Sequence, residues 1–246
     1  MLSRSLLISG VSSGIGQGMA RKYEAEGFQV LGIDINPLKP SDSGRFAFSQ
    51  MDLVAPNAVA NIVEFLENTI FQRQSLIGCI SCAGVDLFEK FSDSTFGRAS
   101  KCLEQNFFAA YHLNAAYVEF YKKNSLDRGR IINFSSVNSI VGSDNHAVYC
   151  GAKGAISSYS RALAIELARI GITVNVISPG CIDTPMFRND AKTGYERDFG
   201  QLVTSYPVGR IGEVKDLFSS VDYLLDERSD FVTGVNLVVD GGMSAQ

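Results

Sequence analysis

The sequence predicts an α/β fold in which a mainly parallel, seven-stranded sheet is covered by helices on both faces. Two observations support this fold class. Short apolar runs alternate with segments of helical periodicity along the whole chain, and no linker, repeat or low-complexity tract interrupts the alternation. Such alternation favours parallel pairing, because each connection has to cross the sheet before the next strand begins. With 246 residues, 46% of them hydrophobic, the chain is long enough for one doubly wound domain over residues 1–246.

The expected elements follow from the spacing of apolar residues. Strands are expected at residues 5–9, 29–34, 45–50, 76–82, 130–135, 173–178 and 234–239. Helices are expected at residues 16–26, 57–72, 95–124, 149–170 and 213–225. A loop is expected in place of the usual crossover helix after residue 34, because that connection is short and is interrupted by Pro37 and Pro40.

Charge and cysteine content argue against several classes of protein. The net charge is −4 and the 22 basic residues are scattered, which is unlike a nucleic-acid-binding protein. The longest apolar stretches run about five to seven residues, too short to cross a bilayer, and no signal peptide is recognisable. Five cysteines without a disulfide framework favour the reducing cytoplasm. Cys79 and Cys82 fall within an apolar strand, which favours buried, inert thiols over a zinc or redox site, and no metal is expected.

A glycine-rich turn follows the first expected strand and opens into the first helix. It runs Gly10-Val11-Ser12-Ser13-Gly14-Ile15-Gly16. Glycines here permit a tight turn and let backbone N–H groups approach a pyrophosphate at the positive end of the helix. Glycine turns also occur for purely structural reasons, but a strand before this one and a helix after it favour dinucleotide binding.

Two acidic residues follow neighbouring strands. Asp34 ends the second strand, 18 residues beyond Gly16, where a carboxylate would accept hydrogen bonds from the adenosine ribose hydroxyls. No arginine or lysine adjoins it to neutralise a 2′-phosphate, so NAD is favoured over NADP. The alternative is a solvated aspartate that starts a turn. Asp52 follows the third strand and is a candidate acceptor for the adenine amino group.

Tyr149 and Lys153 are one helical turn apart and share one helix face. Ser136 precedes Tyr149 by 13 residues and follows a strand end, at the edge where doubly wound sheets bind their ligands. A tyrosine ordinarily titrates near about 10, so a fixed ammonium and an oxidised nicotinamide would be needed to stabilise its phenolate at neutral pH. Ser135 competes for the role of the reactive hydroxyl, but the spacing to Tyr149 selects Ser136.

With these residues in place, the sequence resembles the short-chain dehydrogenase/reductase superfamily, in its single-domain branch, over essentially its whole length. The matching segments are Gly10-x-x-x-Gly14-x-Gly16, Cys82-Ala83-Gly84, Asn106, Ser136, Tyr149-x-x-x-Lys153, Ser178-Pro179-Gly180 with Thr184, and Val239-Asp240-Gly241-Gly242. The resemblance implies a Rossmann-type domain that transfers a hydride between NAD(H) and a secondary alcohol or ketone. One departure is Ser81-Cys82-Ala83-Gly84, where the family commonly has Asn-Asn-Ala-Gly, so two amide side chains are lost.

The resemblance also implies residue roles. Tyr149 is expected to be the general acid/base, Lys153 to lower its pKa and hold the nicotinamide ribose, Ser136 to bind the substrate oxygen, and Asn106 to help hold a water for proton relay. Taken singly, Ser136, Asn106 and Thr184 could instead be a strand cap, an exposed helix residue and a turn residue. The cofactor is expected to contact Gly10, Ser12, Ser13, Gly14, Ile15, Gly16, Asp34, Asp52, Leu53, Cys82, Ala83, Gly84, Tyr149, Lys153, Pro179, Gly180, Ile182 and Thr184.

The substrate is expected between residues 137–148 and residues 185–206, in contact with Ser136, His146, Tyr149 and Met186. The second segment has the composition of a closing lid, with hinges at Gly194 and Gly200 and basic residues that could meet an acidic substrate or simply face solvent: Arg188, Lys192 and Arg197. His146 could equally be a surface-loop histidine. The short connection after Asp34 resembles NAD-dependent members that oxidise ring hydroxyls or short hydroxy acids.

Two expectations concern the molecule as a whole. The long helices at residues 95–124 and 149–170 resemble those through which family members form tetramers, so a homotetramer is expected. The alternative to an enzyme is a catalytically silent nucleotide sensor or scaffold of the same fold. The intact set of Asn106, Ser136, Tyr149 and Lys153 argues against that alternative.

Overall fold

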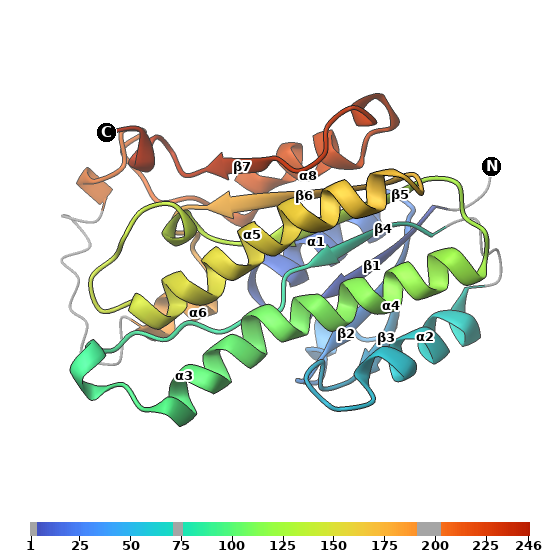
Figure 1. The fold of residues 1–246 in the computed structure, drawn as a ribbon, viewed down its shortest axis with the longest axis horizontal. Helices are drawn as coiled ribbons and strands as arrows, with labels where there is room; N and C mark the ends of the chain where they lie inside the picture. Colours follow the sequence, from blue (N-terminus) through green and yellow to red (C-terminus); the bar gives the residue numbers. More distant parts are fainter. Residues whose placement is uncertain (1–3, 71–75, 191–202) are drawn as a thin grey trace.

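The computed structural model describes residues 4–70, 76–190 and 203–246, and seven strands in this part of the chain form one sheet (Figure 1). Every neighbouring pair is parallel, so the seven-stranded Rossmann-type fold predicted from the sequence is confirmed. The order across the sheet is β3-β2-β1-β4-β5-β6-β7. The strands are β1 (Ser5–Ser9), β2 (Gln29–Asp34), β3 (Ala47–Gln50), β4 (Leu76–Ser81), β5 (Gly129–Phe134), β6 (Ile172–Pro179) and β7 (Asn236–Val239).

Helices cover both faces of this sheet, because successive side chains of a strand point to opposite sides. Leu6 and Ile8 of β1 pack against one set of helices, whereas Leu7 packs against the other. Figure 1 shows α2, α4 and α5 in front of the sheet and α1 and α8 behind it. The helices are α1 (Gly14–Ala25), α2 (Ala58–Thr69), α3 (Phe96–Leu103), α4 (Ala109–Lys123), α5 (Ala147–Ala168), α6 (Pro185–Asp190) and α8 (Phe218–Leu225).

Several element boundaries differ from the sequence expectations for identifiable reasons. The helix expected at residues 95–124 is interrupted by a π-helical turn at Glu104–Phe108, which periodicity alone does not reveal. The helix expected from residue 213 begins with a 3₁₀ turn, Val214–Leu217. β7 starts two residues late because Gly234 has a left-handed φ of +76°. The loop expected after β2 is confirmed, and it contains only the 3₁₀ turn Pro40–Asp42.

The position of β1 fixes where a ligand can enter. β1 lies between β2 and β4, so the connections that leave the carboxyl ends of β1 and β4 run in opposite directions across the sheet. Their divergence opens a crevice at this edge, into which the loops after β1, β2, β4, β5 and β6 all project. Within residues 4–70, 76–190 and 203–246, no helix is both long and apolar enough to span a membrane.

Candidate active site

A groove of about 210 Å³ lies over the carboxyl ends of β1, β2 and β4 and is bordered by the glycine turn. Gly10 has a φ of +75°, and a Cβ there would lie 2.9 Å from the backbone nitrogen of Ala83. A Cβ on Gly16 would lie 2.2 Å from the carbonyl oxygen of Gly10. Only glycine therefore lets these backbones close on one another, and the N-terminus of α1 opens onto the groove. Both features suit the pyrophosphate of a dinucleotide.

Asp34 presents a fixed carboxylate at the far end of this groove. Its side chain is buried, Oδ2 accepts from the backbone N–H of Ser12 at 2.9 Å, and Oδ1 accepts from that of Asn36 at 2.9 Å. Ser12 therefore acts on Asp34 instead of lining the groove. Among the described residues that line the groove, none is a lysine or arginine. The ribose end of the groove thus carries a negative charge without a neighbouring cation.

Most of the residues expected to touch the cofactor are brought together here from separate loops. The members of the expected set that line the groove are Gly10, Ser13, Gly14, Ile15, Gly16, Asp34, Asp52, Leu53, Cys82, Ala83, Gly84 and Thr184. Pro179, Gly180 and Ile182 line the adjoining cavity. Ile15, Thr184 and Met186 line both spaces, so the groove and the cavity are continuous at that point.

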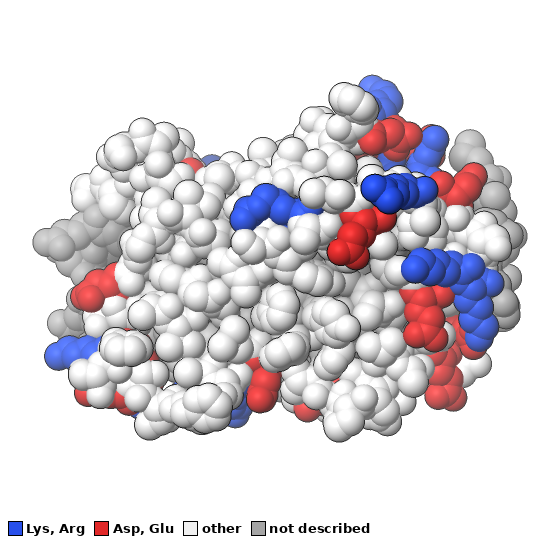
Figure 2. Space-filling model, in the orientation of Figure 1, with Lys and Arg blue, Asp and Glu red and all other residues white. Residues whose placement is uncertain are grey.

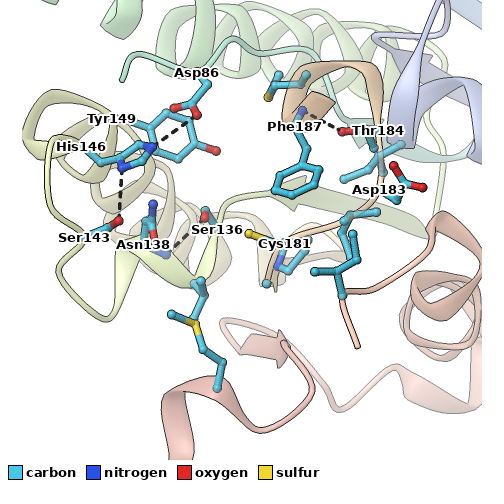
Figure 3. Close-up of a pocket in the computed structure, with 18 of the residues that line it drawn as sticks. Asp86, Ser136, Asn138, Ser143, His146, Tyr149, Cys181, Asp183, Thr184 and Phe187 are labelled. Atoms are coloured by element: carbon cyan, nitrogen blue, oxygen red, sulfur yellow. Dashed lines mark hydrogen bonds and ion pairs between the residues drawn. The ribbon is translucent and has the colours of Figure 1, made fainter. Parts of the chain in front are cut away.

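The second space, here called the Tyr149 cavity, has a volume of about 690 Å³. Of the residues expected to meet substrate, Ser136, His146, Tyr149 and Met186 all line it. Figure 3 shows Tyr149 and His146 on one side with the Tyr149 hydroxyl directed inward, and Thr184, Asp183 and Phe187 on the opposite side. The cavity is large enough for a nicotinamide ring and a small substrate together.

Tyr149 and Ser136 line the same cavity, and hydrogen bonding by Ser136 lowers the pKa of Tyr149. Ser136 Oγ accepts from the backbone N–H of Asn138 at 3.2 Å, which leaves its own proton to be donated into the cavity. Ser135, the competing serine, instead donates to the carbonyl oxygen of Lys153 at 2.8 Å and accepts from Ser157. The geometry therefore leaves Ser136 as the hydroxyl available to a substrate.

The electrostatic surroundings of Tyr149 favour the neutral phenol. Burial is the largest effect and raises the pKa of Tyr149, the Asp86 carboxylate raises it further, and the hydrogen bond with Ser136 lowers it. Lys153 was expected to lower the pKa of Tyr149. In the protein without a bound nucleotide, the net effect of the surroundings is instead to raise it. A phenol held in this state is a proton donor.

Lys153 lies behind Tyr149, one turn further along α5. Its side chain is 6% exposed, and Nζ donates to the carbonyl oxygen of Phe134 at 3.2 Å and lies 5.7 Å from the centre of the Tyr149 ring. Burial lowers the pKa of Lys153 to about 8. Cys102, Cys82 and the Asp86 carboxylate raise this pKa, but burial has the larger effect, so the amine beside Tyr149 keeps a lowered pKa.

Asn106 sits in the π-helical turn and is completely buried. Its Nδ2 donates to the carbonyl oxygens of Val85 and Cys102, both at 2.9 Å, while Oδ1 has no hydrogen-bond partner. A Cβ on Gly84 would lie 2.5 Å from that oxygen and 3.4 Å from Lys153 Nζ. An unpartnered buried oxygen next to the lysine fits a polar group that is bound there, as the expected water relay requires.

Relatives of known identity agree with this geometry. A family model described as enoyl-(acyl carrier protein) reductase matches residues 10–244. The chain belongs to the short-chain dehydrogenase/reductase superfamily. It is 27% identical to the 3-oxoacyl-(acyl-carrier-protein) reductase of Haemophilus influenzae, covering 99% of both chains. It is 28% identical to an NAD-dependent glycerol dehydrogenase of Listeria innocua, covering 96% of this chain and 92% of the relative. A short-chain dehydrogenase of Leptospira borgpetersenii, solved with bound NAD⁺, superposes with a TM-score of 0.86 at 28% identity, covering 98% of this chain and 93% of that one.

The departure of this dehydrogenase/reductase from Asn-Asn-Ala-Gly is accommodated by β1. Ser9 Oγ accepts from the backbone N–H groups of both Cys82 and Ala83, each at 3.2 Å. This hydroxyl joins β1 to the loop after β4 at the point where the groove floor is formed. Cys79 and Cys82 are free thiols whose pKa is raised by burial. Among the residues described, no group of three or more His, Cys, Asp or Glu side chains could hold a metal ion.

His146 is buried, so the surface-loop interpretation is wrong for this residue. The spacing to Tyr149 was its only signal. Asn138 and Ser143 line the Tyr149 cavity from the expected segment 137–148. Sequence reasoning missed several other residues that line it, because nothing in their local pattern distinguishes them from loop residues: Asp86, Phe88, Cys181, Ile211 and Met243. Arg188, one of the expected lid cations, is engaged by Asp183 at 2.6 Å. Lys192, Gly194, Arg197 and Gly200 lie outside the described residues.

Proposed function

We propose that this chain is an NAD(H)-dependent oxidoreductase that interconverts a secondary alcohol and the corresponding ketone, with Tyr149 as its general acid/base. The observation that carries the proposal is that Tyr149 and Ser136 both line a cavity that is continuous with the nucleotide groove. When it is bound, the nicotinamide supplies or accepts the hydride. The protein has to supply the proton and to stabilise the charge that develops on oxygen.

In the reductive direction, Ser136 donates a hydrogen bond to the ketone oxygen, and the Tyr149 phenol transfers its proton to that oxygen as negative charge develops there. In the oxidative direction, Tyr149 receives the alcohol proton. The pKa of Lys153 is about 8, so at pH 8 about half of the molecules carry a protonated Lys153. The protonated ammonium stabilises a Tyr149 phenolate. Asn106 Oδ1, buried without a partner, is suited to a water that returns protons to this group.

Tyr149→Phe tests this assignment. The substitution removes the proton donor but keeps the ring, so kcat/KM for every accepted alcohol or ketone should fall by about 10²- to 10⁴-fold, whereas NADH binding measured by fluorescence should change little. Unchanged turnover in the variant would show that Tyr149 does not transfer the proton. A protein that binds NADH but turns over no alcohol or ketone in a broad panel would instead favour a sensor or scaffold.

NAD is proposed as the preferred cofactor because of Asp34. Its buried carboxylate is held by two backbone N–H groups at the ribose end of the groove, where a 2′-phosphate would meet a like charge. The Leptospira relative supports this choice in that it was solved with NAD⁺. Asp34→Ala should bring kcat/KM for NADP closer to that for NAD. Asp52→Ala, an exposed carboxylate on the same groove, is the matched control and should leave the ratio unchanged.

A homotetramer is proposed from the surface over α3, α4 and α5. Figure 2 shows this face to be mostly uncharged, although a few charged side chains lie over α5 and others lie toward the ends of the view. Exposed apolar side chains on these helices and on the π-helical turn between α3 and α4 include Phe96, Leu103, Phe108, Tyr111 and Ile165. Such a face is characteristic of subunit contacts. Solution scattering should give four times the monomer mass, and a monomer mass would contradict the proposal.

A further inference from the structure

The loop after β4 places a carboxylate in the Tyr149 cavity that the proposed function does not use. Asp86 lies two residues beyond Gly84 and lines the cavity together with Ser136 and Tyr149. Its side chain is 15% exposed, so the carboxylate is largely withdrawn from solvent but still reaches the cavity. A carboxylate in such a position is costly unless other groups bind it.

The orientation of Asp86 is fixed by its neighbours. Oδ1 accepts from the backbone N–H of Leu87 at 2.8 Å, and Oδ2 lies 3.3 Å from Nε2 of His146. His146 is itself held, since its Nδ1 lies 3.1 Å from Ser143 Oγ and 3.0 Å from the carbonyl oxygen of Asp144. Its ring packs edge-on against Phe88 at 4.8 Å. The carboxylate is therefore preorganised by a chain of contacts that ends in the rigid start of α5 (Figure 3).

The same imidazole connects Asp86 to the reactive phenol. The centres of the His146 and Tyr149 rings are 5.9 Å apart, and Asp86 is the charged group that most strongly raises the pKa of Tyr149. The Asp86 carboxylate and the Tyr149 hydroxyl therefore belong to one cavity, which a single small substrate would share. Part of the remaining lining is apolar: Val137, Ile182, Met186, Phe187 and Ile211. The cavity's other carboxylate, Asp183, is paired with Arg188 at 2.6 Å.

A carboxylate accepts hydrogen bonds and donates none when ionised, and its two oxygens together have about four acceptor positions. A substrate group that satisfies Asp86 must therefore carry a donor. We propose that Asp86, positioned by His146, is a specificity-determining residue that accepts a hydrogen bond from a second hydroxyl on the carbon next to the reacting carbon. The preferred substrates are then vicinal diols and α-hydroxy ketones. This inference rests on the proposed function, because it concerns the substrate of the same site.

The test compares two alcohols that differ only in this hydroxyl. Wild-type protein should oxidise butane-2,3-diol with a kcat/KM roughly tenfold to a hundredfold above that for butan-2-ol, as expected for a hydrogen bond to a charged acceptor. Asp86→Ala should bring the ratio close to about one by lowering only the value for the diol. Asp86→Asn keeps the shape of the side chain but removes its charge, and should give an intermediate ratio. It also serves as the second variant if Asp86→Ala does not fold.

The matched control is Asp93→Ala, which removes an exposed carboxylate from the following turn and should leave the ratio at its wild-type value. Equal losses for both alcohols in Asp86→Ala, or a wild-type ratio near one, would overturn the inference while the proposed function stands. A purely structural Asp86–His146 pair would give that result. If wild-type protein binds NADH but oxidises neither alcohol and reduces neither corresponding ketone, the proposed function fails as well, so the two failures are distinguishable.

Discussion

Replacing Lys153 by methionine should make the protein more stable and inactive at the same time. Burial lowers the pKa of Lys153 from 10.5 to about 8, and at about 1.4 kcal/mol per pH unit this difference corresponds to about 3 kcal/mol. The unfolded chain binds the lysine proton more tightly than the folded protein does. At pH values below 8 the folded state therefore carries this full cost, and the cost disappears as the pH rises from 8 to 10.5.

Methionine has a similar length and no charge, so Lys153→Met removes the cost at every pH. It also removes the hydrogen bond from Nζ to Phe134, worth about 1 kcal/mol. A net gain of about 2 kcal/mol in the free energy of unfolding is expected at pH 7, which is roughly 5 °C in Tm for a chain of this size. Because the charge that stabilises the Tyr149 phenolate is lost, turnover should fall together with this gain.

The assay is urea or thermal unfolding of both proteins without nucleotide, at pH 7 and at pH 10. The stability difference should be largest at pH 7 and should shrink at pH 10, where wild-type Lys153 is neutral. Lys101→Met, at an exposed position on α3, should show no such pH dependence. A Lys153→Met variant that is less stable than wild type at pH 7, or a difference that does not depend on pH, would refute the reasoning.

Two further predictions concern the first helix and its contacts. Gly16→Ala should abolish NADH binding and lower Tm, because the new Cβ would lie 2.2 Å from the Gly10 carbonyl oxygen, whereas Gly97→Ala, with no atom within 4 Å, should leave both unchanged. Asp42→Asn should destabilise the protein in urea at pH 7, because the hydrogen bond with Arg21 holds the pKa of Asp42 below its usual value. The stabilisation by the ionised Asp42 is fully present at pH values above the ordinary carboxyl pKa, and it is lost as the pH falls through the lowered pKa of the folded protein. The free energies of unfolding of wild type and variant should therefore become equal at acid pH. Equal stability at pH 7 would show that the ion pair between Arg21 and Asp42 contributes nothing.

The main features of the nucleotide site could be predicted from the sequence, because they depend on local order along the chain. The turn between the first strand and the first helix is recognisable from Gly10, Gly14 and Gly16, and Asp34 is recognisable as the last residue of the next strand. The periods of the apolar pattern predicted the strands and the helices between them, whereas the order of strands across the sheet comes from the structure. The spacing of Tyr149 and Lys153 is likewise a local property of a helix.

Other features of the site depend on contacts between segments that are far apart in the sequence, and only the tertiary structure determines these. No period in the sequence reveals the π-helical turn that buries Asn106. The same is true of the hydrogen bond from the loop after β4 to the Ser9 hydroxyl and of the contact between Asp86 and His146. The pKa of Tyr149 belongs to the same class, since burial by the surrounding elements sets it. The sequence by itself therefore determined the fold and the family, and it predicted the residues of the proposed reaction centre. The shape and charge of the Tyr149 cavity arise only when segments that follow several different strands converge at one edge of the sheet.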